Sequence, residues 1–168
     1  MVKTFKEFIA ESIWSDIQDR SRGKIERKEN EIVSNIKKLK PVDMGVSVFW
    51  ADRDLESDEN VYFSFQDTKK IIKNSGWRLP TFNEISELNT YSTMHKNTFE
   101  ECELHANDND LIFDKCGYKR YADDEVINPD AYYAWTSTAY VSIKINRYLR
   151  LNPMNCEDRC CVRLVKDK

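Results

Sequence analysis

An abrupt change of pattern at Val42 constrains this chain more than any other feature. Residues 20–41 are very polar, which predicts an exposed linker with a helix from Glu29 to Leu39 that Pro41 ends. The stretch from Gly45 to Ala51 then alternates in the manner of a half-buried strand. We therefore expect a folded domain over residues 42–168, preceded by an appendage of residues 1–41.

The appendage begins with a periodic segment. Over residues 2–19, apolar side chains recur at three- and four-residue steps with charged residues between them. This spacing predicts an amphipathic helix. The apolar positions are Phe5, Phe8, Ile9, Ile13 and Ile17.

Two helices are expected in the first half of the domain. Asp67 is placed to cap a helix that Gly76 closes. The second helix begins at Thr81, whose hydroxyl can accept the Glu84 amide proton while the Glu84 carboxylate returns to the Thr81 amide. Ile85 and Leu88 form its expected buried stripe.

The remainder of the domain predicts strands and long loops. Residues from Asn89 to Leu111 are polar and are expected to form a loop, as is the acidic stretch from Asp123 to Asp130. Helices followed by several strands indicate an α+β class. The expected strands are Val61 to Phe65, Leu111 to Phe113, Tyr133 to Thr138, Val141 to Leu151 and Cys160 to Val165.

Composition excludes several classes of protein. The 168 residues suit one domain, and 40% hydrophobic residues allow a packed core. The net charge of −3 gives no basic excess for binding nucleic acid. The basic cluster of Lys37, Lys38 and Lys40 is short and is expected to be solvated surface.

The sequence predicts neither a membrane span nor a secretion signal. No apolar run approaches the roughly 18 residues that a membrane helix needs. Met1 to Ala10 lacks the uninterrupted apolar core of a signal peptide, so a cytoplasmic or virion location is expected. The five cysteines are an odd number, and without secretion free thiols are the expectation.

Five segments, taken in order, resemble one family. They are Val42 to Ala51, Gly76 to Leu88, Leu111 to Tyr118, Tyr133 to Thr138, and Val162 to Asp167. They resemble the opening strand, the Trp-Arg-Leu-Pro-Thr segment, the strand after the central helix, the Trp-containing strand and the closing strand of the Fibrobacter-type major paralogous domain. The resemblance covers roughly residues 42–168. It implies a C-type-lectin-like fold with two helices, twisted antiparallel strands and long loops.

Several residues of these segments have a structural explanation. Trp77 and Trp135 are large aromatic side chains suited to anchor a loop-rich core. Arg78 and Arg163 are expected to pair with carboxylates, for example Glu84 or Asp43.

The chain departs from the sugar-binding chemistry of C-type lectins. It has only Asn128-Pro129-Asp130 and Trp135-Thr136-Ser137 where calcium-binding lectins carry their ligand motifs. The acidic residues near the first triplet are expected to form a solvated turn, so neither a metal nor another cofactor is expected. These residues are Asp123, Asp124, Glu125 and Asp130.

A second resemblance lies at the N-terminus. Lys3 to Glu11 is similar to the capsid-targeting leader of internal proteins in large tailed phages. This similarity implies cleavage between Glu11 and Ser12, a place in the virion, and contact with phage structural proteins through residues 2–19. The alternative is an amphipathic helix that docks on the domain or on a partner.

Catalytic signals are weak. His95 and His105 are expected in loops, and no triad order, phosphate-binding loop or metal-ligand spacing is present. The most reactive-looking segment is Cys156 to Cys161. A cysteine enzyme, a surface zinc clip and a core position for Cys160 or Cys161 are the alternatives there, and the core position is favoured. We therefore expect no enzyme.

The expected function is recognition. Lectin-like domains serve as the variable proteins of diversity-generating retroelements, and Asn146 to Cys160 occupies the place that is diversified in them. We expect a non-enzymatic, phage-encoded, virion-associated module that binds a protein or glycan through C-terminal loops. The alternative is a structural or internal packaged virion protein that uses the fold only as a scaffold. The expected binding side chains, some of which strand alternation must bury, are Tyr132, Tyr133, Tyr140, Arg147, Tyr148 and Arg150.

Overall fold

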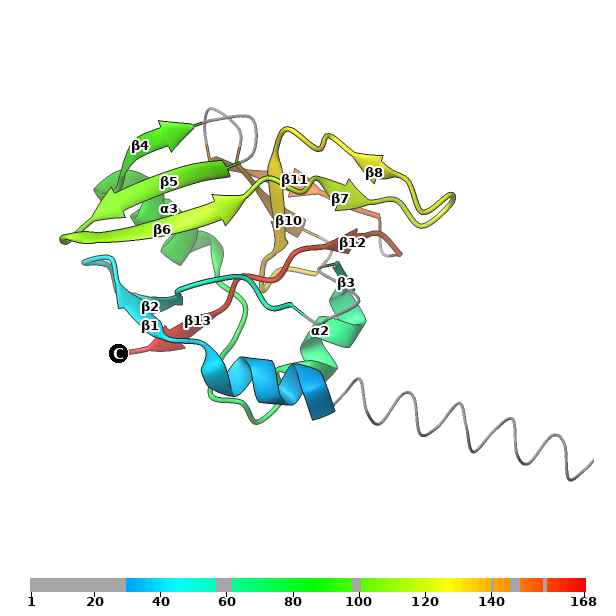
Figure 1. Cartoon of the computed structure of the whole chain (residues 1–168), viewed down its shortest axis with the longest axis horizontal. Coiled ribbons are helices and arrows are strands. Elements are labelled where there is room, and N and C mark those ends of the chain that lie inside the picture. Colours follow the sequence, from blue (N-terminus) through cyan, green and yellow to red (C-terminus); the bar gives the residue numbers. More distant parts are fainter. Residues whose placement is uncertain (1–29, 57–61, 98–100, 140, 146–148, 156) are drawn as a thin grey trace, which may run out of the picture.

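The computed structural model describes residues 30–56, 62–97, 101–139, 141–145, 149–155 and 157–168. The helix expected over residues 2–19 and the leader sequence lie outside these ranges. Within them, the chain forms four small antiparallel sheets and three short helices (Figure 1). None of these helices is long and apolar enough to cross a membrane.

The helices are short and lie between strands. A helix of residues 30–38 precedes the first strand, as expected from the pattern before Pro41. The other two described helices are α2 (Phe65–Ile71) and α3 (Phe82–Tyr91).

Two of the four sheets consist of consecutive strands, and the other two combine strands that are distant in the chain. One sheet has the order β1-β2-β13, with β1 (Pro41–Asp43), β2 (Val48–Ala51) and β13 (Val165–Asp167). A second has the order β11-β10-β9, with β9 (Tyr132–Trp135), β10 (Val141–Ile145) and β11 (Leu149–Pro153). A third has the order β3-β12-β7-β8, with β3 (Phe63–Ser64), β7 (Tyr118–Lys119), β8 (Val126–Ile127) and β12 (Arg159–Cys160). The fourth has the order β4-β5-β6, with β4 (Thr93–Asn97), β5 (Glu101–Ala106) and β6 (Asn109–Asp114).

This architecture overturns the expected fold class. The α+β, C-type-lectin-like class is wrong, because the described chain is mostly β-structure in four separate small sheets. The main cause is the segment between Asn89 and Leu111. It was expected to be a loop, but it contains β4, β5 and the start of β6, which together form one sheet. The expected single strand from Val141 to Leu151 is also wrong, since it is the hairpin of β10 and β11.

Local sequence signals set the helix starts. The Thr81 capping box is confirmed: the Thr81 hydroxyl accepts from the Glu84 amide at 3.4 Å, and the Glu84 carboxylate accepts from the Thr81 amide at 2.7 Å. The cap expected at Asp67 is wrong by three residues. Ser64 is the N-cap of α2, and its hydroxyl accepts from the Asp67 amide.

The hairpin of β5 and β6 closes with a two-residue turn. Asn107 and Asp108 both have positive φ, at 50° and 57°, and Ala106 pairs with Asn109 across the turn. This is the geometry that twisted hairpins favour, and Asn and Asp tolerate it best after glycine. The turn sets the register that buries Cys102, Leu104 and Ala106 on one face of β5.

The cysteines depart from the expectation of free thiols. Cys116 and Cys161 form a disulfide, whereas Cys102 and Cys160 are free and buried. Gly117 forms a β-bridge with Tyr132, and Cys161 forms one with Ala134. The segments that carry Cys116 and Cys161 therefore both run along β9. Strand β9 therefore brings the two sulfur atoms together. Burial of Cys160 and Cys161 confirms the core position favoured for them.

The guanidinium of Arg163 lies in the centre of the molecule, with only 1% of its side chain exposed. Its Nε donates to Asp54 at 2.6 Å, Nη1 donates to the Ala51 carbonyl at 3.0 Å and Nη2 donates to the Ile112 carbonyl at 2.5 Å. The Phe113 ring lies 4.5 Å from the guanidinium carbon. The expected pairing of Arg163 with a carboxylate is confirmed, but the partner is Asp54, because Asp43 pairs with Lys168.

Replacing Arg163 with methionine tests this buried pair. Arg163→Met leaves the Asp54 carboxylate nearly buried without its cation, so we expect a loss of about 3–5 kcal/mol in the free energy of unfolding. Arg53→Met is the matched control, because Arg53 pairs with Asp52 at the surface and is worth at most about 1 kcal/mol. Urea unfolding measures both, and equal losses in the two variants would contradict the central position of Arg163.

Gly76 and Gly117 have similar backbone angles but different surroundings, so replacing each with alanine separates the cost of a steric clash from the cost of the backbone conformation. Gly76 and Gly117 have φ of 76° and 67°, but a Cβ on Gly117 would overlap the Ile127 carbonyl oxygen whereas one on Gly76 meets nothing within 4 Å. We expect Gly76→Ala to cost about 1 kcal/mol and Gly117→Ala about 3 kcal/mol. Thermal and urea unfolding provide the comparison, and a Gly117→Ala variant as stable as Gly76→Ala would refute the close packing.

Candidate functional site

The structure places two of the six expected binding side chains in the core. Tyr132 and Tyr133, both in β9, are 0% and 1% exposed. The Tyr132 hydroxyl donates to Asp54 at 2.7 Å, and the Tyr133 hydroxyl accepts from the Asn128 amide at 3.1 Å. Both tyrosines are therefore structural residues and are not available to contact a ligand.

The other four expected binding residues are not brought together by the described structure. Tyr140, Arg147 and Tyr148 lie outside the described residues. Arg150 lies in β11, where its backbone pairs with Lys144 of β10. Recognition through these four side chains stays a prediction.

The acidic loop is neutralised by neighbouring cations. Asp123 and Glu125 pair with Arg120 at 2.5 Å and 2.8 Å, and Asp124 pairs with Lys119 at 2.7 Å. Among the residues that the structure describes, no group of three or more potential metal ligands is present.

The histidines and two of the cysteines, which were the candidate catalytic residues, lie in strands or in the core. His95 and His105 lie in β4 and β5, so the expectation that they are loop residues is wrong. The His105 Nδ1 lies 2.5 Å from an Asp110 carboxylate oxygen across the hairpin. Burial raises the pKa of the Cys160 thiol well above its ordinary value and that of Cys102 to about 11. Both thiols are therefore protonated at neutral pH and are poor nucleophiles.

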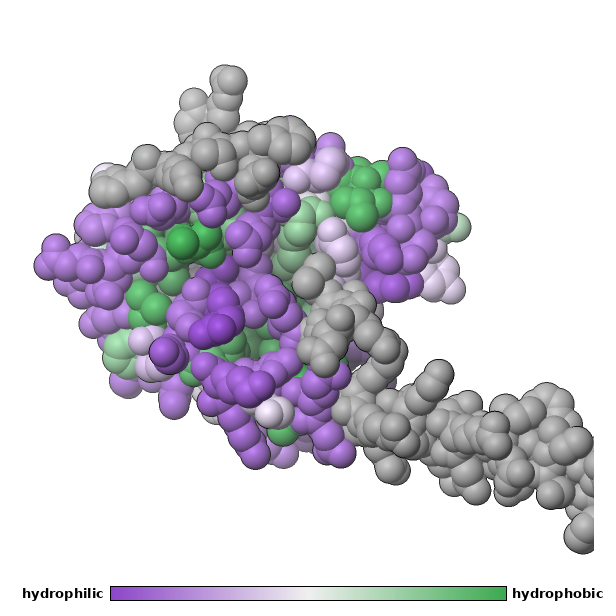
Figure 2. Space-filling view, in the orientation of Figure 1, coloured by the Kyte–Doolittle hydropathy of each residue, from purple (hydrophilic) through white to green (hydrophobic). Residues whose placement is uncertain are grey.

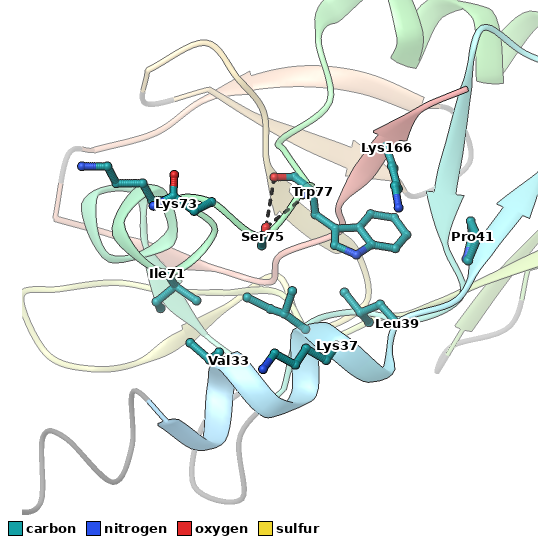
Figure 3. Close-up of a pocket in the computed structure, with 11 residues that line it drawn as sticks. Val33, Lys37, Leu39, Pro41, Ile71, Lys73, Ser75, Trp77 and Lys166 are labelled. Carbon is teal, nitrogen blue, oxygen red and sulfur yellow. Dashed lines mark hydrogen bonds between the residues drawn. The ribbon is translucent and has the colours of Figure 1, made fainter.

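A pocket of about 380 Å³ lies where the helix of residues 30–38 meets the rest of the chain (Figure 3). Its walls come from that helix, the end of α2 with the turn that follows, the start of β1, and β13. The volume is within the range of small-ligand and side-chain pockets. The lining residues are Val33, Ile36, Lys37, Leu39, Pro41, Ile71, Lys73, Asn74, Ser75, Trp77 and Lys166.

The apolar part of the pocket is an extension of the core. Ile36, Leu39 and Trp77 are at most 9% exposed and belong to one hydrophobic cluster with the interior. The turn before Trp77 is fixed by Ser75, whose hydroxyl donates to the Ile72 carbonyl at 2.7 Å and accepts from the Trp77 amide at 3.1 Å. The indole is thus held in place as a preformed wall, as Figure 3 shows.

The described charged groups of the pocket all have the same sign. Lys37, Lys73 and Lys166 line it, and no carboxylate of a described residue does. None of these three lysines forms a side-chain hydrogen bond or ion pair with a described residue. Other lysines are paired: Lys119 with Asp124 and Lys168 with Asp43, each at 2.7 Å. The pocket therefore combines an apolar wall with cations that lack a counter-charge in the described chain.

An ion-pair network holds two parts of the pocket together. Arg78, next to Trp77, donates to both Glu84 carboxylate oxygens at 2.9 Å and 2.6 Å and to Asp167, next to Lys166, at 2.6 Å. The Arg78 and Val165 backbones exchange hydrogen bonds of 2.9 Å and 2.8 Å. The expected Arg78–Glu84 pair is confirmed, and the contacts of Arg78 with Asp167 and Val165 hold the Trp77 segment beside Lys166.

Sequence reasoning missed this pocket. Lys37 is exposed, as expected, but nothing local in the sequence connects it with Lys73 and Lys166, which lie far from it in the chain. The sequence features that could have indicated a pocket here are the turn at Asn74 to Gly76 and the large aromatic residue Trp77 that follows it.

Comparison with protein-family models, with curated proteins and with solved structures gives no match. The family resemblance therefore stays a prediction, and the function has to be argued from the site itself.

The Glu84 carboxylate gives the network a defined pH dependence. Burial acts to raise the pKa of Glu84, but hydrogen bonds from Arg78 and from the Thr81 amide outweigh it and hold the pKa below its ordinary value of 4.5. A depressed pKa contributes stability that is fully present above pH 4.5 and is lost as the pH falls through the folded-state pKa.

We expect Glu84→Gln to be less stable than the unmodified chain at pH 7, with the difference shrinking as the pH falls below about 4.5. Urea unfolding of both proteins at pH 7, 5, 4 and 3 measures this difference. A gap that stays constant down to pH 3 would show that the carboxylate charge contributes nothing.

Proposed function

We propose that this chain is a non-enzymatic recognition module that binds an acidic segment of a partner protein in the pocket beside Trp77. The observation that carries the proposal is a set of three lysines around an apolar wall, none of which forms an ion pair with a described residue. Unpaired cations next to a low-dielectric wall attract an anionic group and favour one that carries an apolar body.

The charge of the pocket is opposite to that of the chain as a whole. The chain has a net charge of −3, yet the described charged residues that line the pocket are all lysines. Such a local reversal steers an acidic partner to this place while the remaining surface repels it. A nucleic acid is less well suited, because a long polyanion would meet that surface as well.

The mouth of the pocket favours a protein segment over a small enclosed molecule. Val33 lines the pocket and is nevertheless 42% exposed, so apolar surface continues beyond the cavity. A ligand larger than the cavity covers Val33 as well. The face shown in Figure 2 is mostly hydrophilic with small separate hydrophobic spots, and it offers no broad apolar patch as a competitor.

The environment of the reactive side chains supports a non-enzymatic module. Cys161 is in the disulfide with Cys116, the Cys160 thiol is buried with a raised pKa, and His105 is engaged with Asp110. The expected virion location depends on residues 1–11, and the expected binding by C-terminal loops depends in part on Tyr140, Arg147 and Tyr148; all of these lie outside the described ranges, so both expectations stay predictions.

Selection from a random peptide library on the full chain tests the proposal. We expect the enriched peptides to combine carboxylates with a large aliphatic or aromatic side chain. The variant Lys37→Glu/Lys73→Glu/Lys166→Glu should bind them at least about tenfold more weakly, and added salt should weaken binding to the unmodified chain.

Lys40→Glu is the matched control. Lys40 is exposed and adjoins two pocket residues in sequence, but it does not line the pocket. This variant should bind the selected peptides as the unmodified chain does. Enriched peptides that bind the triple variant undiminished would place recognition elsewhere, and a library that yields no binder would overturn the proposal of a protein ligand.

A further inference from the structure

Two of the three described lysines of the pocket lie on opposite sides of it. Figure 3 places Lys73 at one end, beside the end of α2, and Lys166 at the other, beside Pro41. Ile71, Trp77 and Leu39 lie between them in the same view. Apolar side chains thus lie between two lysines, one on either side of the cavity, and the Lys73 ammonium group points away from it (Figure 3).

The backbones that carry these two lysines are fixed independently. The Lys73 amide donates to the Lys70 carbonyl at 3.3 Å, in the turn that Ser75 closes. Lys166 pairs with Phe49 across the β2–β13 ladder, next to the bridge between Arg78 and Val165. Neither backbone is therefore free to move toward the other, and the two lysines stay on opposite sides of the apolar side chains (Figure 3).

We propose that the partner segment presents two acidic residues, one on either side of a large apolar residue that lies against Trp77. This inference rests on the proposed function and adds a requirement for two separated anionic groups. Lys37 also lines the pocket, from the helix of residues 30–38, and adds positive potential to it.

The spacing of the two charges sets specificity. A ligand with one acidic group leaves one lysine without a counter-charge, whereas a ligand with two satisfies both ends. Each rim ion pair is individually weak, so discrimination comes from their sum. The apolar residue between them fixes the register of the segment in the pocket.

Short peptides acetylated and amidated at their ends test this directly. The two-acid peptide has the core Glu-Ala-Leu-Ala-Glu. Two one-acid peptides replace either Glu with Gln, a no-acid peptide replaces both, and a second series varies the number of alanines. The readout is the chemical shift of the Trp77 indole N–H in the full chain, assigned with Trp77→Phe.

We expect one spacing at which the two-acid peptide binds about fivefold more tightly than either one-acid peptide. In Lys73→Gln and in Lys166→Gln this advantage should fall below about twofold. Lys40→Gln should retain it, since Lys40 does not line the pocket.

The outcomes separate this inference from the function on which it rests. One-acid and two-acid peptides that bind equally at every spacing, with binding still dependent on the pocket lysines, would overturn the two-acid requirement and leave the proposed function intact. No shift of the Trp77 resonance with any acidic peptide would overturn both. A thymidylate octamer that shifts this resonance more strongly than the two-acid peptide would reassign the pocket to nucleic acid.

Discussion

The buried guanidinium of Arg163 is the constraint on which the rest of the structure depends. A charge removed from water is tolerable only when a counter-charge and enough hydrogen-bond acceptors surround it. Here Asp54 supplies the charge, and the Ala51 and Ile112 carbonyls supply the remaining acceptors. These groups come from β2, from the segment after it and from β6, so the small sheets can only satisfy Arg163 when they are assembled together. Four sheets of two- to six-residue strands, each too small to be stable alone, thus pack around two hydrophobic clusters.

Local signals in the sequence predicted part of this fold, and signals that depend on distant pairing did not. The capping box of Thr81 and Glu84 needs only four consecutive residues, so it was predictable. The strand β5 was missed because its buried side chains are a cysteine, one leucine and an alanine between charged residues, which resembles a polar loop. Its period of two was visible, but only the turn at Asn107 and Asp108 and the partner strand β6 turn that pattern into a sheet.

The candidate site shows the same division. Burial of Trp77 and the pairing of Arg78 with Glu84 were predictable, because six residues separate the partners. The approach of Lys166 to Trp77 was not, because it results from a bridge between segments 87 residues apart in the chain, Arg78 and Val165. Tyr132 and Tyr133 illustrate the opposite error: residue types that dominate interfaces also fill cores, and only the structure distinguishes the two cases.

One wall of the pocket is the helix of residues 30–38, which contributes Ile32 and Ile36 to the core together with the following Leu39. These apolar contacts hold this wall against the domain. Local unfolding of this helix would remove the wall and leave the sheets in place. The chain with the helix docked and the chain with it detached are therefore two states in equilibrium. Any ligand that needs the closed wall is therefore linked to helix docking by mass action, and its concentration sets how firmly the N-terminal part of the chain is attached to the domain.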